Sequence, residues 1–128
     1  MEKRGGREIG KAGEEIACKY LMQRGQTILE RNWRAGHLEI DIISLDKDGM
    51  HFVEVKSRMA PALAEPQENV NIVKQKRIAN AALKYLHSKA EKLDLGQVEV
   101  FFDIVAIIFD KEDTEVTYFP KAYIPMYY

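Results

Sequence analysis

The chain has 128 residues, of which 46% are hydrophobic and 30% charged, a length and composition typical of one globular domain spanning 1–128. Its single cysteine excludes an internal disulfide, and no apolar run approaches the roughly 20 residues of a membrane helix, so we expect a cytoplasmic protein. A net charge of −1 argues against a protein that coats nucleic acid through bulk positive charge.

The first half of the chain predicts one helix and three strands. Apolar residues recur every three or four positions from about Arg7 to Arg24, which favours an amphipathic helix. A strand over Thr27–Trp33 follows. The next two strands, 37–44 and 50–58, are expected to form a hairpin, with Asp48-Gly49 as its turn.

The second half predicts a loop, a long helix and two more strands. Two prolines within Met59–Glu68 exclude regular structure there, so we expect a loop with some mobility inside the domain. A helix is predicted over about Asn71–Ala90, capped by Asn69 or Asn71. The apolar run 98–110 predicts a central strand, and Glu115–Phe119 a final one. The resulting order, α-β-β-β-α-β-β, predicts an α/β sandwich with a mixed sheet.

Three polar side chains of the hairpin are predicted to meet on one face of the sheet. Side chains alternate between the two faces of a strand, so Glu54 and Lys56 share a face. A hairpin loop of two or four residues places odd positions of the first strand beside even positions of the second, which brings Asp41 to that face. In the same scheme Ile40 and Ile42 lie together on the opposite face, in the core.

This arrangement suits phosphodiester hydrolysis. Carboxylates of Asp41 and Glu54 roughly 5 Å apart would repel each other, and Mg²⁺ or Mn²⁺ would relieve the repulsion and activate a bound water. The Lys56 ammonium could then stabilise the attacking group. Glu14 is expected to face the buried side of the first helix, whereas Glu15 faces solvent and pairs with lysine. The alternative left open is a solvated strand face on which Asp41 pairs with Lys56.

Six motifs occur in order between about Gly10 and Pro120: GKAGEEIACKYL, ILERNWR, LEIDII, FVEVKSR, VNIVKQKRI and FFDIVAI. Together they resemble the YraN-like bacterial proteins, an uncharacterised family of the kind given a UPF label. That family is similar to the PD-(D/E)xK restriction-endonuclease-like superfamily, most closely to archaeal Holliday-junction resolvases. The resemblance implies a restriction-endonuclease-like three-layer α/β/α sandwich with a central mixed sheet.

The resemblance also implies a function. It points to a metal-dependent endonuclease that cleaves DNA in repair or recombination, with Mg²⁺ or Mn²⁺ as cofactor and branched DNA as one candidate substrate. One alternative is a catalytically weak nucleic-acid-binding module that acts within a larger assembly, and another is a structural protein whose polar face is only solvated. By analogy with resolvases, which cut two strands, the protein could form a homodimer. As a module of a larger assembly, it could act with a DNA-repair or DNA-uptake partner protein.

Carried over residue by residue, the resemblance makes Asp41, Glu54, Lys56 and Glu14 the catalytic set. Asp41, Glu54 and Glu14 would hold the metal. Lys74 matches a recurrent basic position that would touch phosphate. Arg34 and Arg58 are two further candidates for nucleic-acid contact in this chain. The chain departs from the pattern in having Leu38 where the family usually has glycine and Ile40 where the superfamily has proline, which weakens the assignment of a particular DNA substrate.

The remaining residues with reactive or aromatic side chains are expected to have mainly structural positions. Asp103 matches the family's Phe-Asp segment and is expected to be a buried structural carboxylate. The three histidines, of which His51 falls on the face opposite Glu54, show no metal-ligand spacing and are expected at the surface or with satisfied ring nitrogens. Cys18 is predicted to pack at the helix edge. Trp33 could stack on a base or belong to the rim of the core.

Overall fold

The computed structural model describes residues 6–60, 72–93, 98–111 and 113–124. Its elements in chain order are α1 Gly6–Gln23, β1 Thr27–Ala35, β2 Leu38–Leu45, β3 Met50–Met59, α2 Ile72–Leu93, β4 Val100–Phe109 and β5 Thr114–Tyr123. This order confirms the sequence prediction. Most of the predicted loop 59–68, together with the proposed caps Asn69 and Asn71, lies outside the described residues. Within the described part of the chain, neither helix is long and apolar enough to cross a membrane.

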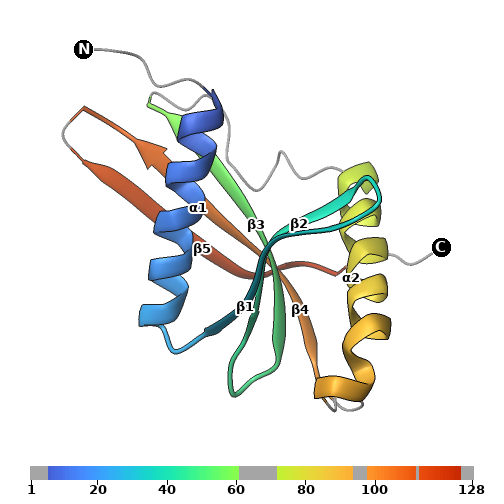
Figure 1. The fold of residues 1–128 in the computed structure, drawn as a ribbon. Coiled ribbons are helices and arrows are strands. Elements are labelled where there is room, and N and C mark those ends of the chain that lie inside the picture. The colour runs from blue at the N-terminus through green and yellow to red at the C-terminus, as the bar shows by residue number, and fades with distance from the viewer. Residues whose placement is uncertain (1–5, 61–71, 94–97, 112, 125–128) are drawn as a thin grey trace.

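The five strands form one mixed sheet in the order β1-β2-β3-β4-β5. The β3–β4 pair is parallel, because the chain crosses over through α2 between these strands, and the other three pairs are antiparallel. In Figure 1, α1 lies along one face of the twisted sheet and α2 along the other. The result is the three-layer α/β/α sandwich with a central mixed sheet that was expected.

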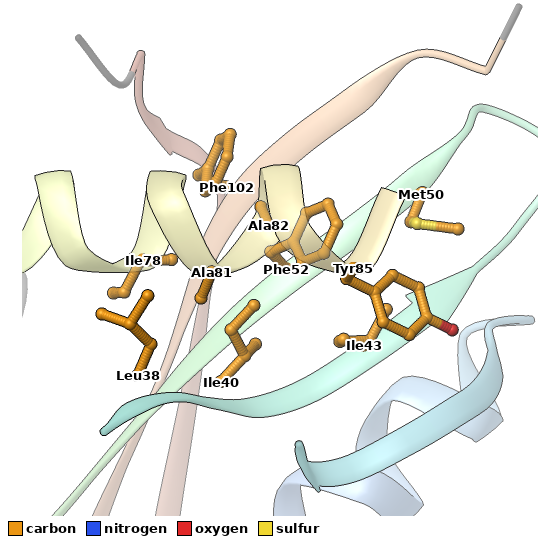
Figure 2. Close-up of a cluster of buried hydrophobic side chains, with 10 residues drawn as sticks. All are labelled: Leu38, Ile40, Ile43, Met50, Phe52, Ile78, Ala81, Ala82, Tyr85 and Phe102. Carbon is orange, nitrogen blue, oxygen red and sulfur yellow. The ribbon is translucent and has the colours of Figure 1, made fainter. Parts of the chain in front are cut away.

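Each helix covers its own hydrophobic cluster. Figure 2 shows the cluster under α2, which joins Leu38, Ile40, Ile43, Met50, Phe52, Ile78, Ala81, Ala82, Tyr85 and Phe102. The cluster under α1 contains Ile9, Ala17, Cys18, Leu21, Ile42, Val53, Val105, Ile107 and Phe109. Cys18 is therefore a buried packing residue, as expected. Trp33 packs edge-on against Tyr85, with ring centroids 5.2 Å apart, and so belongs to the rim of the core.

The C-terminus of α1 is fixed by Gly25. Its φ of +92° is one that other residues rarely adopt. The N–H of Gln26 donates to Leu21 O and that of Gly25 to Met22 O, the two bonds of a Schellman cap. The helix ends at Gln23, within one residue of the predicted end at Arg24.

The hairpin loop between β2 and β3 has four residues, 46–49, and not the two of a tight Asp48-Gly49 turn. Leu45 pairs with Met50, and Asp46 Oδ1 accepts hydrogen bonds from the N–H groups of Asp48 and Gly49. A Cβ at Gly49 would lie 2.4 Å from the Glu99 carbonyl oxygen, so this position requires glycine. Loops of two and of four residues both pair odd positions of β2 with even positions of β3, so the predicted pairing of the two strands is still correct.

The expectation that Ile40 and Ile42 share a core face was wrong. Ile42 faces α1, whereas Ile40 and Ile43 both face α2. The β2–β3 ladder extends from Leu45↔Met50 only as far as Ile42↔Val53, while the β1–β2 ladder continues to Leu38. Beyond Ile42, β2 follows β1 away from β3, and this rotation interrupts the alternation of its side chains. Asp41 lies at the point where the two strands separate.

Candidate active site

The separation of β2 from β3 places a carboxylate between the two strands. Asp41 Oδ2 accepts a hydrogen bond of 2.8 Å from the backbone N–H of Val55, so its side chain replaces the backbone acceptor that a paired strand would supply. Asp41 lies close enough for its carboxyl group to interact with that of Glu54, a buried residue of β3 that is 9% exposed. The predicted meeting of Asp41 and Glu54 therefore occurs in the structure.

Negative charge on both carboxylates of this pair is unfavourable. Burial raises the pKa of Asp41 to about 8, the neighbouring Glu54 carboxylate and the more distant Glu14 add to the rise, and the Val55 N–H opposes it. Two acidic groups in this setting cannot both carry a full negative charge at neutral pH without a compensating cation or proton. A pair of this kind is more typical of functional sites than of a solvated strand face.

Two lysines complete the cluster. Lys74 of α2 forms an ion pair with Glu54 Oε1. Although burial by itself lowers the pKa of Lys74, the Glu54 carboxylate outweighs it and the pKa is raised. Lys56 has a lowered pKa, first because of burial and then because the positively charged Lys74 lies beside it. Lys56 is thus an amine that gives up its proton more readily than an ordinary lysine. The partner of Glu54 from α2 was not anticipated from the sequence.

Glu14 lies near this cluster without joining it directly. Its Oε2 accepts a hydrogen bond of 2.9 Å from Asn32 Nδ2, and Asn32 has a left-handed φ of +50°. The charge of Glu14 contributes to the raised pKa of Asp41. Glu15 faces solvent as predicted, but its partner is Arg31 of β1, 3.0 Å away, and not a lysine of its own helix. The helix-neighbour rule failed there because a strand side chain is within reach.

The residues present fit a divalent cation held by two carboxylates. Among the described residues, no group of three or more His, Cys, Asp or Glu is placed to hold a metal ion. Mg²⁺ commonly uses only one or two protein carboxylates and keeps several waters, so Asp41 and Glu54 meet its needs. Because Glu14 is hydrogen-bonded to Asn32, it suits a role through a water better than direct ligation.

Positive charge flanks the site on both sides of β2. A cleft of about 360 Å³ is lined by His37, Leu38, Glu39, Glu54, Val73, Lys74, Arg77 and Ile78. A second cleft, of about 470 Å³, is lined by Arg7, Gly10, Lys11, Glu14, Asn32, Arg34 and Glu39. Of the predicted nucleic-acid contacts, Lys74 and Arg34 thus line separate clefts, and the Arg58 charge acts on Lys56. The exposed Arg34 lies 3.5 Å from Glu39.

Asp103 belongs to a different cluster, at the hairpin-loop end of the sheet. Its side chain is fully buried and accepts hydrogen bonds from Tyr118 Oη at 2.5 Å and from the Lys121 N–H at 2.9 Å. The Nδ1 atom of His51 lies 2.6 Å from Asp103 Oδ2. Asp103 is therefore buried, as expected. Of the two ring nitrogens of His51, Nδ1 is satisfied and Nε2 has no hydrogen-bond partner among the described residues, so the expectation of satisfied nitrogens holds for one of them. Sequence reasoning missed the His51–Asp103 pair, because nothing local to either residue signals it.

Two solved structures are similar to this chain at low sequence identity. A repair endonuclease from Pyrococcus abyssi is 15% identical, with a TM-score of 0.36, and the match covers 83% of this chain and 39% of that one. SfsA from Pyrococcus furiosus in complex with Ca²⁺ is 18% identical, with a TM-score of 0.37, and the match covers 89% and 63%. The chain spans less than two thirds of the length of either protein.

Sequence relatives are much closer. A UPF0102 protein from Bacteroides thetaiotaomicron is 38% identical over 118 residues, covering 92% of this chain and 93% of the relative. One from Desulforamulus reducens is 40% identical over 105 residues, covering 81% and 84%. Residues 13–107 match the family described as Uncharacterised protein family UPF0102. The resemblance drawn from the motifs is thereby confirmed, and the chain belongs to the UPF0102 family.

Proposed function

We propose that this protein is a metal-dependent endodeoxyribonuclease that hydrolyses DNA phosphodiesters in the cytoplasm. The observation that carries the proposal is the Asp41–Glu54 carboxylate pair, enclosed where β2 leaves β3 and flanked by Lys56. Two largely buried carboxylates can hold the metal ion that phosphodiester hydrolysis uses, and the neighbouring lysine, whose pKa is lowered, can assist at the reacting phosphate.

Each residue has a role in this proposal. Asp41 and Glu54 hold Mg²⁺ or Mn²⁺, and Glu14 acts on it through water. The bound ion supplies a Lewis acid for the phosphoryl oxygens and acidifies a water. Lys56, beside Glu54 on β3, stabilises the attacking hydroxide and the charge that develops on the phosphoryl group. The Val55 N–H keeps the Asp41 carboxylate turned into the gap between the strands.

The clefts on either side of β2 suit the sugar–phosphate backbone. Arg7, Lys11 and Arg34 line one cleft, and Lys74 and Arg77 the other. Phosphates are bound chiefly by lysine and arginine side chains, so a local group of cations serves a protein whose net charge is near zero. Branched DNA, and a second copy of the chain to cut two strands, extend the proposal on the strength of the resemblance described above.

A second candidate is a nucleic-acid-binding module with little activity of its own. Two observations favour it: Lys74 already balances the charge of Glu54, and the described residues contain no group of three metal-binding side chains. This candidate keeps the basic clefts and predicts nucleic-acid binding that does not depend on Asp41.

Cleavage assays separate the two candidates. Linear duplex, flap and four-way-junction DNA are incubated with wild type, Asp41→Asn and Glu39→Gln in Mg²⁺, Mn²⁺ or EDTA. Glu39→Gln is the matched control, since Glu39 is an exposed carboxylate of the same strand that lines both clefts. The proposal expects metal-dependent cleavage by wild type and Glu39→Gln and none by Asp41→Asn. Binding without cleavage in all three proteins would support the module.

A further inference from the structure

Lys74 occupies a central position among the groups proposed to perform the chemistry. Its ammonium contacts Glu54 Oε1, and its positive charge acts on the neighbouring Lys56. The charge of Asp41 also acts on it. Lys74 reaches this cluster from α2, the helix on the opposite side of the sheet from α1 (Figure 1), whereas Asp41, Glu54 and Lys56 come from the sheet itself.

The contact with Glu54 has a direct consequence for cation binding. Glu54 is 9% exposed and turned toward α2, so a positive charge must stay close to its carboxylate. A divalent cation that binds the same carboxylate takes over this role, and its charge repels the Lys74 ammonium. Lys74 and a divalent cation therefore compete for Glu54.

The surroundings of Lys74 offer its ammonium a different partner. Lys74 lines the cleft of about 360 Å³ that also contains Glu54 and Arg77. A phosphate of a nucleic-acid backbone lying in this cleft would be within reach of a four-carbon lysine stem, and would accept the ammonium without requiring it to stay beside Glu54.

We propose that Lys74 couples metal binding to nucleic-acid binding, by leaving Glu54 for a backbone phosphate and so releasing the Glu54 carboxylate to the metal ion. The inference rests on the function proposed above and adds regulation to the same site. The ion pair keeps metal affinity low until a substrate phosphate is present. Coupling of this kind is reciprocal, so the metal must also tighten nucleic-acid binding by the same factor.

The test measures binding and not turnover. Free Mn²⁺ is followed by electron paramagnetic resonance during titration into wild type, Lys74→Met and Lys74→Gln, without DNA. Lys84→Met is the control, since Lys84 is an exposed lysine of the same helix. Thermal melting checks that each variant is folded. A second experiment follows fluorescence anisotropy of a labelled duplex as Ca²⁺ is added, to obtain the effect of a cation on DNA affinity.

The proposal expects Lys74→Met and Lys74→Gln to bind Mn²⁺ more tightly than wild type, within the 5-fold to 150-fold that is roughly usual for linked sites. Lys84→Met should match wild type. Added Ca²⁺ should tighten DNA binding by wild type and Lys84→Met, and much less by the Lys74 variants. Equal Mn²⁺ affinity in wild type and both Lys74 variants would overturn the coupling and leave the proposed nuclease site standing. Absence of Mn²⁺ binding in every protein would overturn both.

Discussion

Gly13 of α1 lies directly against Ser57 of β3: a Cβ placed on Gly13 would be 1.7 Å from Ser57 Oγ and 2.9 Å from Ser57 Cβ. This contact sets how closely α1 approaches the sheet, and the next residue of the helix, Glu14, contributes to the electrostatics of Asp41. Packing between α1 and β3 and the geometry of the site therefore depend on the same glycine.

Gly13→Ala should destabilise the protein. The extra methyl group collides with Ser57, and overpacking of this kind costs about 1–3 kcal/mol, more than the gain of at most about 1 kcal/mol from alanine in a helix. Urea denaturation measures the difference. Gly10→Ala is the matched control: nothing lies within 4 Å of its added Cβ, so it should be neutral or stabilising. Removing the obstructing side chain with Ser57→Gly should restore part of the stability lost in Gly13→Ala, and failure to do so would argue against the collision.

Asp41 should make the stability of the metal-free protein fall as pH rises. Burial and the Glu54 carboxylate raise its pKa in the folded state to about 8, above the ordinary aspartate value of 3.8. A raised folded-state pKa gives a contribution that is fully present below about pH 4 and is lost as pH rises through about 8. In EDTA, Asp41→Asn should therefore become more stable relative to wild type between pH 5 and pH 9, by an amount on the order of 2–5 kcal/mol. The free energy of unfolding of both proteins is measured by urea denaturation. A difference between them that stays constant across this pH range would contradict a raised pKa of Asp41.

His51 should contribute to stability with the same sign, through a different cause. Burial lowers the pKa of His51, but its hydrogen bond to Asp103 and the charges of Asp103 and Asp46 outweigh burial and raise the pKa above 6.5. Its Nε2 lies 3.0 Å from Asp46 Oδ1, although the two atoms are not aligned for a hydrogen bond. The stabilisation is present below pH 6.5 and is lost as pH rises through the raised value. Thermal melts of His51→Gln should fall further below wild type at pH 6 than at pH 9, and NMR titration should show a His51 pKa above the ordinary histidine value of 6.5.

Lys56 should matter for cleavage far more than for DNA binding. We expect Lys56→Met to lower kcat by about 10²–10³-fold, the usual cost of removing one group that stabilises the transition state, while DNA affinity changes little. Lys56→Arg should not rescue activity, because the larger, planar guanidinium cannot place a compact charge where the lysine ammonium lies. Single-turnover kinetics and anisotropy separate the two effects. Full activity in Lys56→Arg would show that only positive charge is needed there.

The sequence predicted the core of the candidate site because that prediction depended on parity alone. Asp41 is predicted beside Glu54 whether the hairpin loop has two residues or the observed four, so the error in loop length did not change this prediction. The misplacement of Ile40 has a different origin. The strand alternates regularly in sequence, and the divergence of β2 from β3 that interrupts the alternation is set by the pairing of β2 with β1.

The contacts that sequence reasoning missed all join elements distant in the chain. Lys74 reaches Glu54 only because α2 docks on the face of the sheet to which Glu54 points. His51 meets Asp103 because β3 and β4 pair in parallel, a register set by the crossover through α2. No local propensity or spacing encodes such docking, whereas helix ends and strand parity are local.

The most direct test of the central claim is calorimetric titration of Mn²⁺ into wild type, Asp41→Asn and Glu39→Gln. The account predicts that wild type and Glu39→Gln bind the ion, because both retain the Asp41–Glu54 pair, and that Asp41→Asn loses the binding. Equal affinity in wild type and Asp41→Asn, or no binding by wild type, would contradict a metal site between β2 and β3.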